Sequence, residues 1–355
     1  GAGMIGLTYG RSDVAALGVA ASLYHVLNHA VFKGLLFLGA GSVVIATGTR
    51  QIEHLGGLLR KMPWTGLCFL IGAMAISGLP PLNGFASEWL TFQAFLFGFR
   101  GSAEPLVHLL FPIGGALLAL TTALAAACFV KAFGITFLAL PRSAAAAQAH
   151  ESPAVMIVPQ VMLAALCLGL GLFPGTVLAT LEPVVRALPG FAPGAATAGT
   201  SLAMASGLDS FDRVLPALFG VALLTAGGVG LLLAWRRGTK VRRVPTWGCG
   251  GELTGGTEYT ATAFSKPLML IFSSLYRPSR QVEALTEVSP YFTREVRYRS
   301  EIEPTFERRM YEPVVRTVLR LATGMRVLQA GSLQSYIAYV IAMVVTLVLI
   351  VWWRS

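Results

Sequence analysis

Long runs of apolar residues, separated by short polar segments, dominate the chain. A helix needs about 20 mostly apolar residues to cross roughly 30 Å of membrane hydrocarbon. Six stretches reach that length, and they cover approximately residues 14–47, 64–99, 105–140, 153–181, 214–235 and 335–353. The pattern predicts an all-α integral membrane protein that crosses the bilayer several times as a polytopic helix bundle.

The second of these runs contains a helix-breaking motif. The sequence Gly78-Leu-Pro-Pro-Leu-Asn-Gly84 lies near its middle. Pro80 and Pro81 cannot donate backbone hydrogen bonds, and Gly84 adds conformational freedom. We therefore expect a broken transmembrane helix made of two half-helices.

The segment 236–334 differs from the rest, because it is polar and basic yet carries apolar residues at helical spacing near its end. These are Met310, Val314, Val315, Val318, Leu321, Ala322, Met325 and Leu328, and Glu312, Arg316 and Arg320 occupy another face. This predicts an amphipathic helix that lies along the cytoplasmic membrane interface. A cytoplasmic helix packed on its own protein is the alternative.

The runs divide the chain into four parts. Residues 1–13 are expected to be the tail of a preceding helix, because the chain opens with neither Met nor a basic signal region. We therefore interpret the chain as part of a longer polypeptide. Residues 14–235 are predicted to form a five-span bundle, 236–334 a basic interfacial segment and 335–355 a C-terminal transmembrane anchor. The small residues of 190–210 predict an external loop.

The charge distribution predicts the orientation of the spans. The net charge is +10, and 16 of the 27 Lys and Arg residues lie between Arg236 and Arg326. Basic loops of membrane proteins face the cytoplasm, so we place 48–63, 141–152 and 236–334 on that side. The lipid surface, rather than nucleic acid, is the partner that this pattern favours.

No metal site or cofactor is expected from the sequence. The four cysteines, Cys68, Cys128, Cys167 and Cys249, are far apart and form no Cys/His cluster. The glycine-rich stretch 248–256 lacks the Gly-Lys-Ser/Thr signature of a phosphate-binding loop and follows no strand pattern.

Ionisable residues inside an apolar span carry the candidate chemistry. Placing such a side chain in the membrane costs free energy, so its presence there indicates a function. His25, His29 and Lys33 are spaced four residues apart, so they form a stripe along one helix that rises about 12 Å. Histidine titrates near neutral pH and lysine can do so when desolvated, so this stripe could pass protons. Tyr24 and Asn28 could hold bridging water. The alternative is that the histidines bond helix carbonyls and Lys33 reaches to an interface.

Glu88 follows the predicted helix break in the sequence Asn83-Gly-Phe-Ala-Ser-Glu88. A carboxylate there would be a second proton station, with Asn83 and Ser87 beside it. Placement at the first turn of the second half-helix, where the helix dipole favours an anion, is the simpler interpretation and is compatible with the first. Thr121, Thr122 and Lys131 on the third run would extend this path inward, although Lys131 could instead reach to an interface.

These motifs resemble a known family. The run from His25 to Ser42, Gly56-Gly-Leu, and Ser77 to Glu88 resemble the proton-conducting antiporter-like subunits of respiratory complex I, Mrp-type antiporters and membrane-bound hydrogenases. Trp247-Gly-Cys-Gly and Tyr259 to Leu268 are similar to the hydrogenase-4 component B and formate hydrogenlyase subunit 3 branch. The resemblance spans about 17–353 and matches the C-terminal half of that branch.

The resemblance implies the roles of the site residues. His25, His29 and Lys33 match the family's central polar axis, and Glu88 matches its broken-helix position, where several members carry Lys. The family's ionisable residues on earlier helices have no match here. The basic segment and final helix resemble a lateral helix with its anchor.

The resemblance also implies a bacterial or archaeal multi-pass membrane subunit that moves protons, or Na⁺, with other membrane subunits of a redox complex. A structural membrane arm that transports nothing and an independent cation/proton antiporter are the alternatives.

Overall fold

The computed structural model describes residues 1–100, 104–188, 216–236, 246–276, 278–286, 293–302, 306–326 and 331–354. The chain divides into two compact units, Gly1–Phe264 and Ser265–Ser355. The predicted external loop 190–210 lies outside the described residues.

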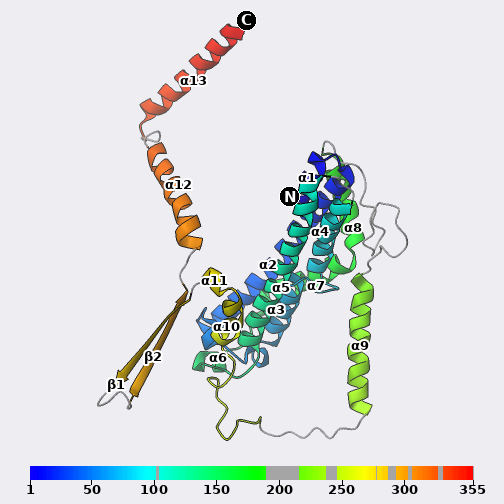
Figure 1. Ribbon diagram of the computed structural model, residues 1–355, viewed down its shortest axis with the longest axis vertical. Helices are drawn as coiled ribbons and strands as arrows, with labels where there is room; N and C mark the ends of the chain where they lie inside the picture. The colour runs from blue at the N-terminus through cyan, green and yellow to red at the C-terminus, as the bar shows by residue number, and fades with distance from the viewer. Residues whose placement is uncertain are drawn as a thin grey trace. The chain divides into compact units, whose positions relative to one another are not determined.

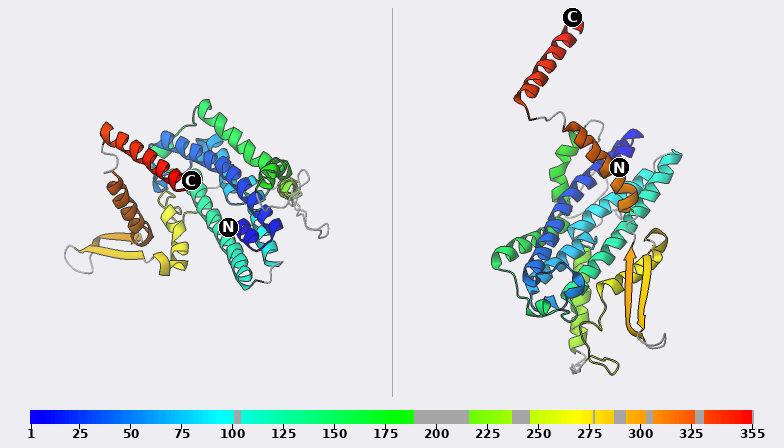
Figure 2. Two further views of the ribbon diagram at one scale, coloured as in Figure 1. Left: turned by 90° about the horizontal axis from the view of Figure 1, so that it is seen from above. Right: turned by 90° about the vertical axis from the view of Figure 1, so that its left-hand side faces the viewer.

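The first unit is a bundle of helices (Figures 1 and 2). Its helices are α1 (Ala2–Thr8), α2 (Ser12–Thr47), α3 (Pro63–Ile76), α4 (Asn83–Arg100), α5 (Pro105–Phe137), α6 (Ala144–Gln148), α7 (Ala154–Leu172), α8 (Pro174–Arg186), α9 (Pro216–Arg236) and α10 (Ala261–Ile271), the last of which extends into the second unit. Short 3₁₀ turns occupy Ile52–His54 and Leu58–Arg60. Helix α2 is the centre of the bundle, because α3, α4, α7 and α8 all pack on it.

The predicted broken helix is present as α3 and α4, which run end to end along α2 in the opposite direction. Ala86, Leu90 and Ala94 of α4 pack with the first half of α2. Phe69 and Ala73 of α3 pack with its second half. The interruption between Ile76 and Asn83 therefore lies beside the middle of α2. Gly84 is required there, because a side chain at this position would clash with the carbonyl of Ala75.

The predicted spans mostly correspond to helices of the structure. Four described helices are long and apolar enough to cross a membrane, at Val14–Thr47, Pro105–Phe137, Ala154–Leu172 and Leu333–Trp353. The prediction of one continuous fourth run over 153–181 is wrong, because α7 ends before Phe173 and Pro174 starts α8. Proline suits the first turn of a new helix but not the interior of one.

The loops 48–62 and 138–152 lie together at one end of the first unit. Arg142 donates to the carbonyl of Leu55 at 2.8 Å, and Ser143 donates to that of His54 at 2.8 Å. Glu151 accepts from the backbone nitrogens of Trp64 and Thr65 at the start of α3. The structure thus brings together two of the loops for which the charge pattern predicts the cytoplasmic side.

The segment before α10 joins these loops. Glu53 accepts hydrogen bonds from the backbone of Ala261 and Thr262 and from the Thr262 hydroxyl. Glu258 accepts from the backbone nitrogen of Leu140 at 2.8 Å. Partial burial alone would raise the pKa of Glu53. The hydrogen bonds from Thr262 and Ala261 and the charge of Arg142 lower the pKa by more than burial raises it, so the net pKa is below its ordinary value.

The second unit contains α11 (Ser273–Tyr276), a β-hairpin, α12 (Glu312–Met325) and α13 (Leu333–Arg354). Strands β1 (Pro278–Thr286) and β2 (Thr293–Ile302) pair antiparallel, with Pro278 opposite Ile302 and an irregularity near Leu285. This hairpin was not predicted and is an addition to an otherwise helical fold. A short π-helical stretch (Glu307–Tyr311) precedes α12, which occupies much of the predicted amphipathic segment. The four-part domain division remains a prediction.

Candidate functional site

Two asparagine side chains connect α2 to the helix break. Asn28 donates through Nδ2 to the carbonyl of Asn83 at 2.8 Å, and Asn83 donates through Nδ2 to Oδ1 of Asn28 at 3.2 Å. Both residues are fully buried. The pair ties the carbonyl and the side chain of Asn83, the first residue of α4, to the middle of α2. Among the described residues no group donates to Oδ1 of Asn83, so this atom offers an acceptor to a buried water.

His25 reaches the first turn of α4 one turn before Asn28. Its Nδ1 lies 3.1 Å from the hydroxyl oxygen of Ser87. Ser87 is itself fully buried and also contacts the carbonyls of Asn83 and Gly84, at 3.3 and 3.2 Å. The ring of His25 is half-buried, so it is neither sealed in the bundle nor fully exposed.

The other members of the predicted stripe continue along α2. The ring centroids of His25 and His29 are 6.1 Å apart, while His29 is exposed and contacts Phe32 edge-on. Lys33 is half-buried one turn further. Tyr24, which was expected to hold water, is fully buried and donates its hydroxyl to the carbonyl of Leu170 in α7.

Glu88 lies on a different side of α4 from Ser87. Successive residues of a helix differ by about 100°, so Ser87 faces α2 while Glu88 faces α5. Thr122 of α5 donates to Oε2 of Glu88 at 3.0 Å. Gly78, in the break, packs against the same carboxylate, and a side chain at position 78 would clash with it. Glu88 is half-buried, and its carboxyl group lies between the helix break and α5.

The remaining path candidates lie apart from Glu88. Thr121 is exposed, and its hydroxyl bonds to the carbonyl of Leu117 in its own helix. Lys131 is half-buried and lies nine residues after Thr122 along α5, or about 13.5 Å at 1.5 Å per residue. Of the three candidates on α5, only Thr122 contacts Glu88 in the part of the chain that the structure describes. Roles for Thr121 and Lys131 stay predictions.

The arrangement places two polar clusters at one depth of the bundle. The first contains His25, Asn28, Asn83 and Ser87, and the second contains Glu88 and Thr122. Both touch the interruption between α3 and α4, where backbone groups are freed from helical bonding. Groups of this kind can bind water and exchange protons, whereas the described residues contain no cluster of three His, Cys, Asp or Glu side chains suited to a metal ion.

One buried polar pair was missed by the sequence analysis. Gln160 of α7 is fully buried and donates to the hydroxyl of Ser42 at 3.0 Å and to the carbonyl of Met156 at 3.0 Å. No group of the described residues donates to its Oε1. Gln160 is the sole amide side chain in the apolar run 154–172. That isolation was the available signal, because a buried amide in an apolar span needs a partner.

The fold and the site define a multi-pass helical membrane protein with a polar, interrupted span at its centre. Residues 4–101, which include α2, the break and Glu88, match the family described as NADH:quinone oxidoreductase/Mrp antiporter, TM. The part of the chain that holds the helix break is therefore similar to a membrane domain of this family.

Individual relatives extend the similarity over the whole chain. Hydrogenase-4 component B of Escherichia coli (strain K12) is 35% identical over 353 residues, which cover 98% of this chain and 52% of that protein. Formate hydrogenlyase subunit 3 of the same strain is 47% identical over 167 residues, which cover 47% of this chain and 27% of that protein. The resemblance that the motifs indicate is confirmed.

A solved structure shares the fold. A chain of the membrane-bound sulfane sulfur reductase, an archaeal respiratory membrane complex, matches with a TM-score of 0.60 at 24% identity, over 94% of this chain and 48% of that one. The chain thus spans about half the length of the relatives that it matches along its whole length.

Proposed function

We propose that this chain is a proton-translocating membrane subunit of a redox-driven complex, of the hydrogenase-4, formate hydrogenlyase or complex I type. The observation that carries the proposal is the meeting of His25 with Ser87, and of Glu88 with Thr122, at an interrupted helix halfway along the central span. Keeping such groups at membrane depth costs free energy, and that cost is expected where ions move.

In this proposal each polar group has a distinct role. His25 and His29, at 6.1 Å between ring centroids, pass protons through intervening water. Lys33 is the central proton carrier, and its positive charge would change how readily the two histidines bind protons. Glu88 is the exchange station on the other side of α4. Asn28 and Asn83 hold the break in place and offer an acceptor for water.

The names of the relatives support the coupling to a redox enzyme. Hydrogenase-4 component B and formate hydrogenlyase subunit 3 are components of larger assemblies by their names. Other membrane subunits of such an assembly are therefore the proposed partners, and the exposed side of His29 is a surface that such a partner could cover. Electron transfer would occur in those other subunits.

The test is proton pumping by the complex that contains this chain, reconstituted in sealed vesicles. We expect Lys33→Ala and Glu88→Gln each to abolish proton uptake while electron transfer continues. Lys61→Gln, in an exposed loop, is the matched control and should pump normally. Undiminished pumping in both site variants would favour a structural membrane arm instead.

A cation/proton antiporter is the second candidate, because the family description includes Mrp antiporters. It predicts that vesicles dissipate a pH gradient when Na⁺ is added, without any electron donor. Proton uptake that requires an electron donor and ignores Na⁺ would exclude this candidate.

A further inference from the structure

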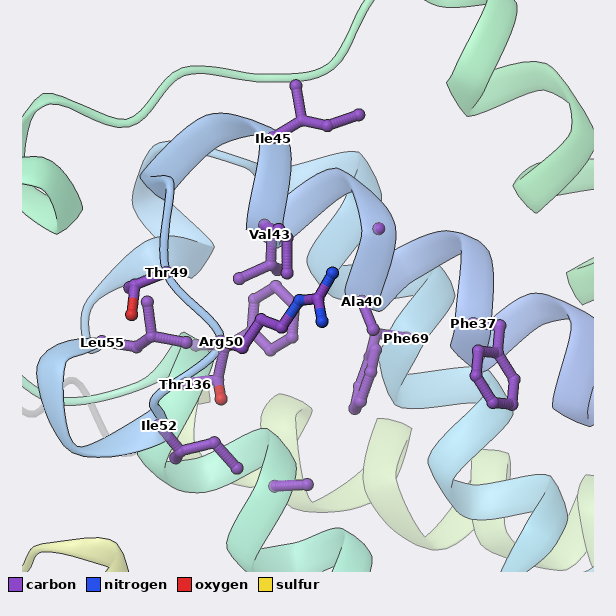
Figure 3. A pocket seen from close by; sticks show the side chains of 14 residues that line it. Phe37, Ala40, Val43, Ile45, Thr49, Arg50, Ile52, Leu55, Phe69 and Thr136 are labelled. Atoms are coloured by element: carbon purple, nitrogen blue, oxygen red, sulfur yellow. The ribbon is translucent and has the colours of Figure 1, made fainter.

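An apolar groove of about 610 Å³ opens beside the end of α2, away from both polar clusters (Figure 3). Its volume lies within the range of roughly 300–1,000 Å³ that is usual for small-molecule sites. Its walls come from the last turns of α2, the loop that follows, α3 and the end of α5. They are formed by Phe37, Ala40, Gly41, Val43, Val44, Ile45, Thr49, Arg50, Ile52, Leu55, Phe69, Ala132, Thr136 and Phe137.

Arg50 is the only charged residue among these lining residues. It is exposed and lies three residues after the end of α2, and Figure 3 shows its side chain among those of Val43, Ala40 and Phe69. The nearby carboxylates are engaged elsewhere, because Glu53 bonds Thr262 and Glu151 bonds the start of α3. The positive charge at the groove is therefore available to an anionic ligand.

The length of the groove matches one half of a bilayer. From Phe37 to the end of α2 at Thr47 the helix advances ten residues, or about 15 Å at 1.5 Å per residue. The hydrocarbon of a bilayer is about 30 Å thick, so one leaflet is about 15 Å. One acyl chain of a leaflet therefore matches the apolar part of the groove in length, with Arg50 at the end where its headgroup would lie.

We propose that this groove binds an anionic phospholipid, with an acyl chain along Phe37, Gly41 and Val44 and the phosphate on Arg50. A lipid with an acyl chain and an anionic headgroup is the ligand whose apolar and charged parts match this lining in both order and length. A purely apolar helix of another protein would instead cover Arg50 and leave its charge unpaired. The proposal does not depend on proton transport, because no residue of the groove belongs to the proposed path.

The experiment uses the complete complex purified from its own membrane in mild detergent. A phosphatidylglycerol with a photoreactive acyl chain is added, and labelled peptides are identified by mass spectrometry. We expect labelling of the α2 peptide around Phe37–Ile45. Phosphatidylcholine with the same reactive chain should label this peptide about fivefold less, because it lacks the net charge that Arg50 would bind.

Four substitutions separate specific binding from general contact with lipid. Arg50→Gln should lower labelling by phosphatidylglycerol about fivefold, and Arg50→Lys should largely preserve it. Arg60→Gln, in the same loop but outside the groove, is the control for loop charge and should label as the wild type does. Gly41→Phe should reduce labelling by filling the groove, since Gly41 has open space beside it.

Several results would overturn the proposal. Equal labelling of the Arg50→Gln and Arg60→Gln complexes, or equal labelling by the two lipids, would show that Arg50 selects no headgroup. An unlabelled α2 peptide in the wild-type complex, together with a protein–protein cross-link to the same residues, would show that another polypeptide fills the groove.

Discussion

The carboxylate of Glu88 fills the space that a side chain at Gly78 would need, at the point where the broken helix is interrupted. Gly78 has a φ of +64°, a conformation that favours glycine, and a side chain there would also collide with Oε2 of Glu88. The same glycine therefore turns the backbone and leaves room for the proposed proton station.

Gly78→Ala is accordingly expected to impair the site. The left-handed conformation alone costs an alanine about 1–2 kcal/mol, and the clash would push the carboxylate away from Thr122. We expect a lower unfolding temperature and proton pumping as low as in Glu88→Gln, measured by dye quenching in vesicles. Gly134→Ala on α5, where a side chain meets nothing within 4 Å, is the control and should pump normally. Wild-type pumping by Gly78→Ala would contradict this role.

The Asn28–Asn83 pair should show energetic coupling. Replacing Asn28 with Leu removes both the bond that Asn28 donates to the carbonyl of Asn83 and the bond that it accepts from the Asn83 amide, so replacing Asn83 as well should then cost less than replacing it alone. Hydrogen bonds between membrane helices are worth about 0.6 kcal/mol on average and up to about 1.7 kcal/mol. We expect a coupling free energy near the upper value, from unfolding measurements on the two single variants and the double variant.

Thr91→Val supplies the control for this double-mutant cycle, because it is expected to show no energetic coupling to Asn28. Its hydroxyl bonds only to the carbonyl of Ser87 in its own helix. Combined with Asn28→Leu, it should give a coupling free energy near zero. A coupling for Asn28 and Asn83 as small as that of the control pair would mean that the bonds between them do not stabilise the fold.

The apolar runs and the Pro-Pro motif were sufficient to predict the central helix and its broken neighbour, because both depend on local chemistry. The pairing of Asn28 with Asn83 was not predictable, since 55 residues separate them and only the packing of α4 on α2 brings them together. The same holds for Gln160 and Ser42. The hairpin β1–β2 was missed because its strands, Pro278–Thr286 and Thr293–Ile302, are rich in charged and polar residues and lie in a segment without long apolar runs.

Glu53 should contribute stability that depends on pH. Its pKa is lowered in the folded protein, so the stabilisation is present above the ordinary value of 4.5 and is lost as the pH falls through the lower folded value. Removing a carboxylate that accepts backbone hydrogens at a helix start costs about 0.5–2 kcal/mol. We expect Glu53→Gln to unfold at a lower temperature than the wild type at pH 7, and the difference to shrink at strongly acidic pH.

The control for Glu53 is Glu252→Gln, an exposed carboxylate in the same part of the chain. Its unfolding temperature should follow that of the wild type at every pH. A gap between Glu53→Gln and the wild type that is constant from pH 7 down to pH 3 would show that the charge of Glu53 is not what joins the loops to α10.

Thr121 and Thr122 offer the sharpest test of the second polar cluster, because they are adjacent threonines with different partners. The hydroxyl of Thr122 lies within hydrogen-bonding distance of Glu88 as well as of the Leu118 carbonyl in its own helix, whereas that of Thr121, among the described residues, bonds only to its own helix. Valine has nearly the same shape as threonine but cannot donate. A hydrogen bond to a charged group contributes about 1.5–3 kcal/mol, and about 1.4 kcal/mol corresponds to a factor of ten. Thr122→Val should therefore slow proton pumping about tenfold at unchanged electron transfer, and Thr121→Val should leave it at the wild-type rate. If both variants pump alike, the bond to Glu88 has no part in proton movement. The expected placement of Glu88 in the first turn of the second half-helix is wrong, because α4 begins at Asn83 and Glu88 is already in its second turn.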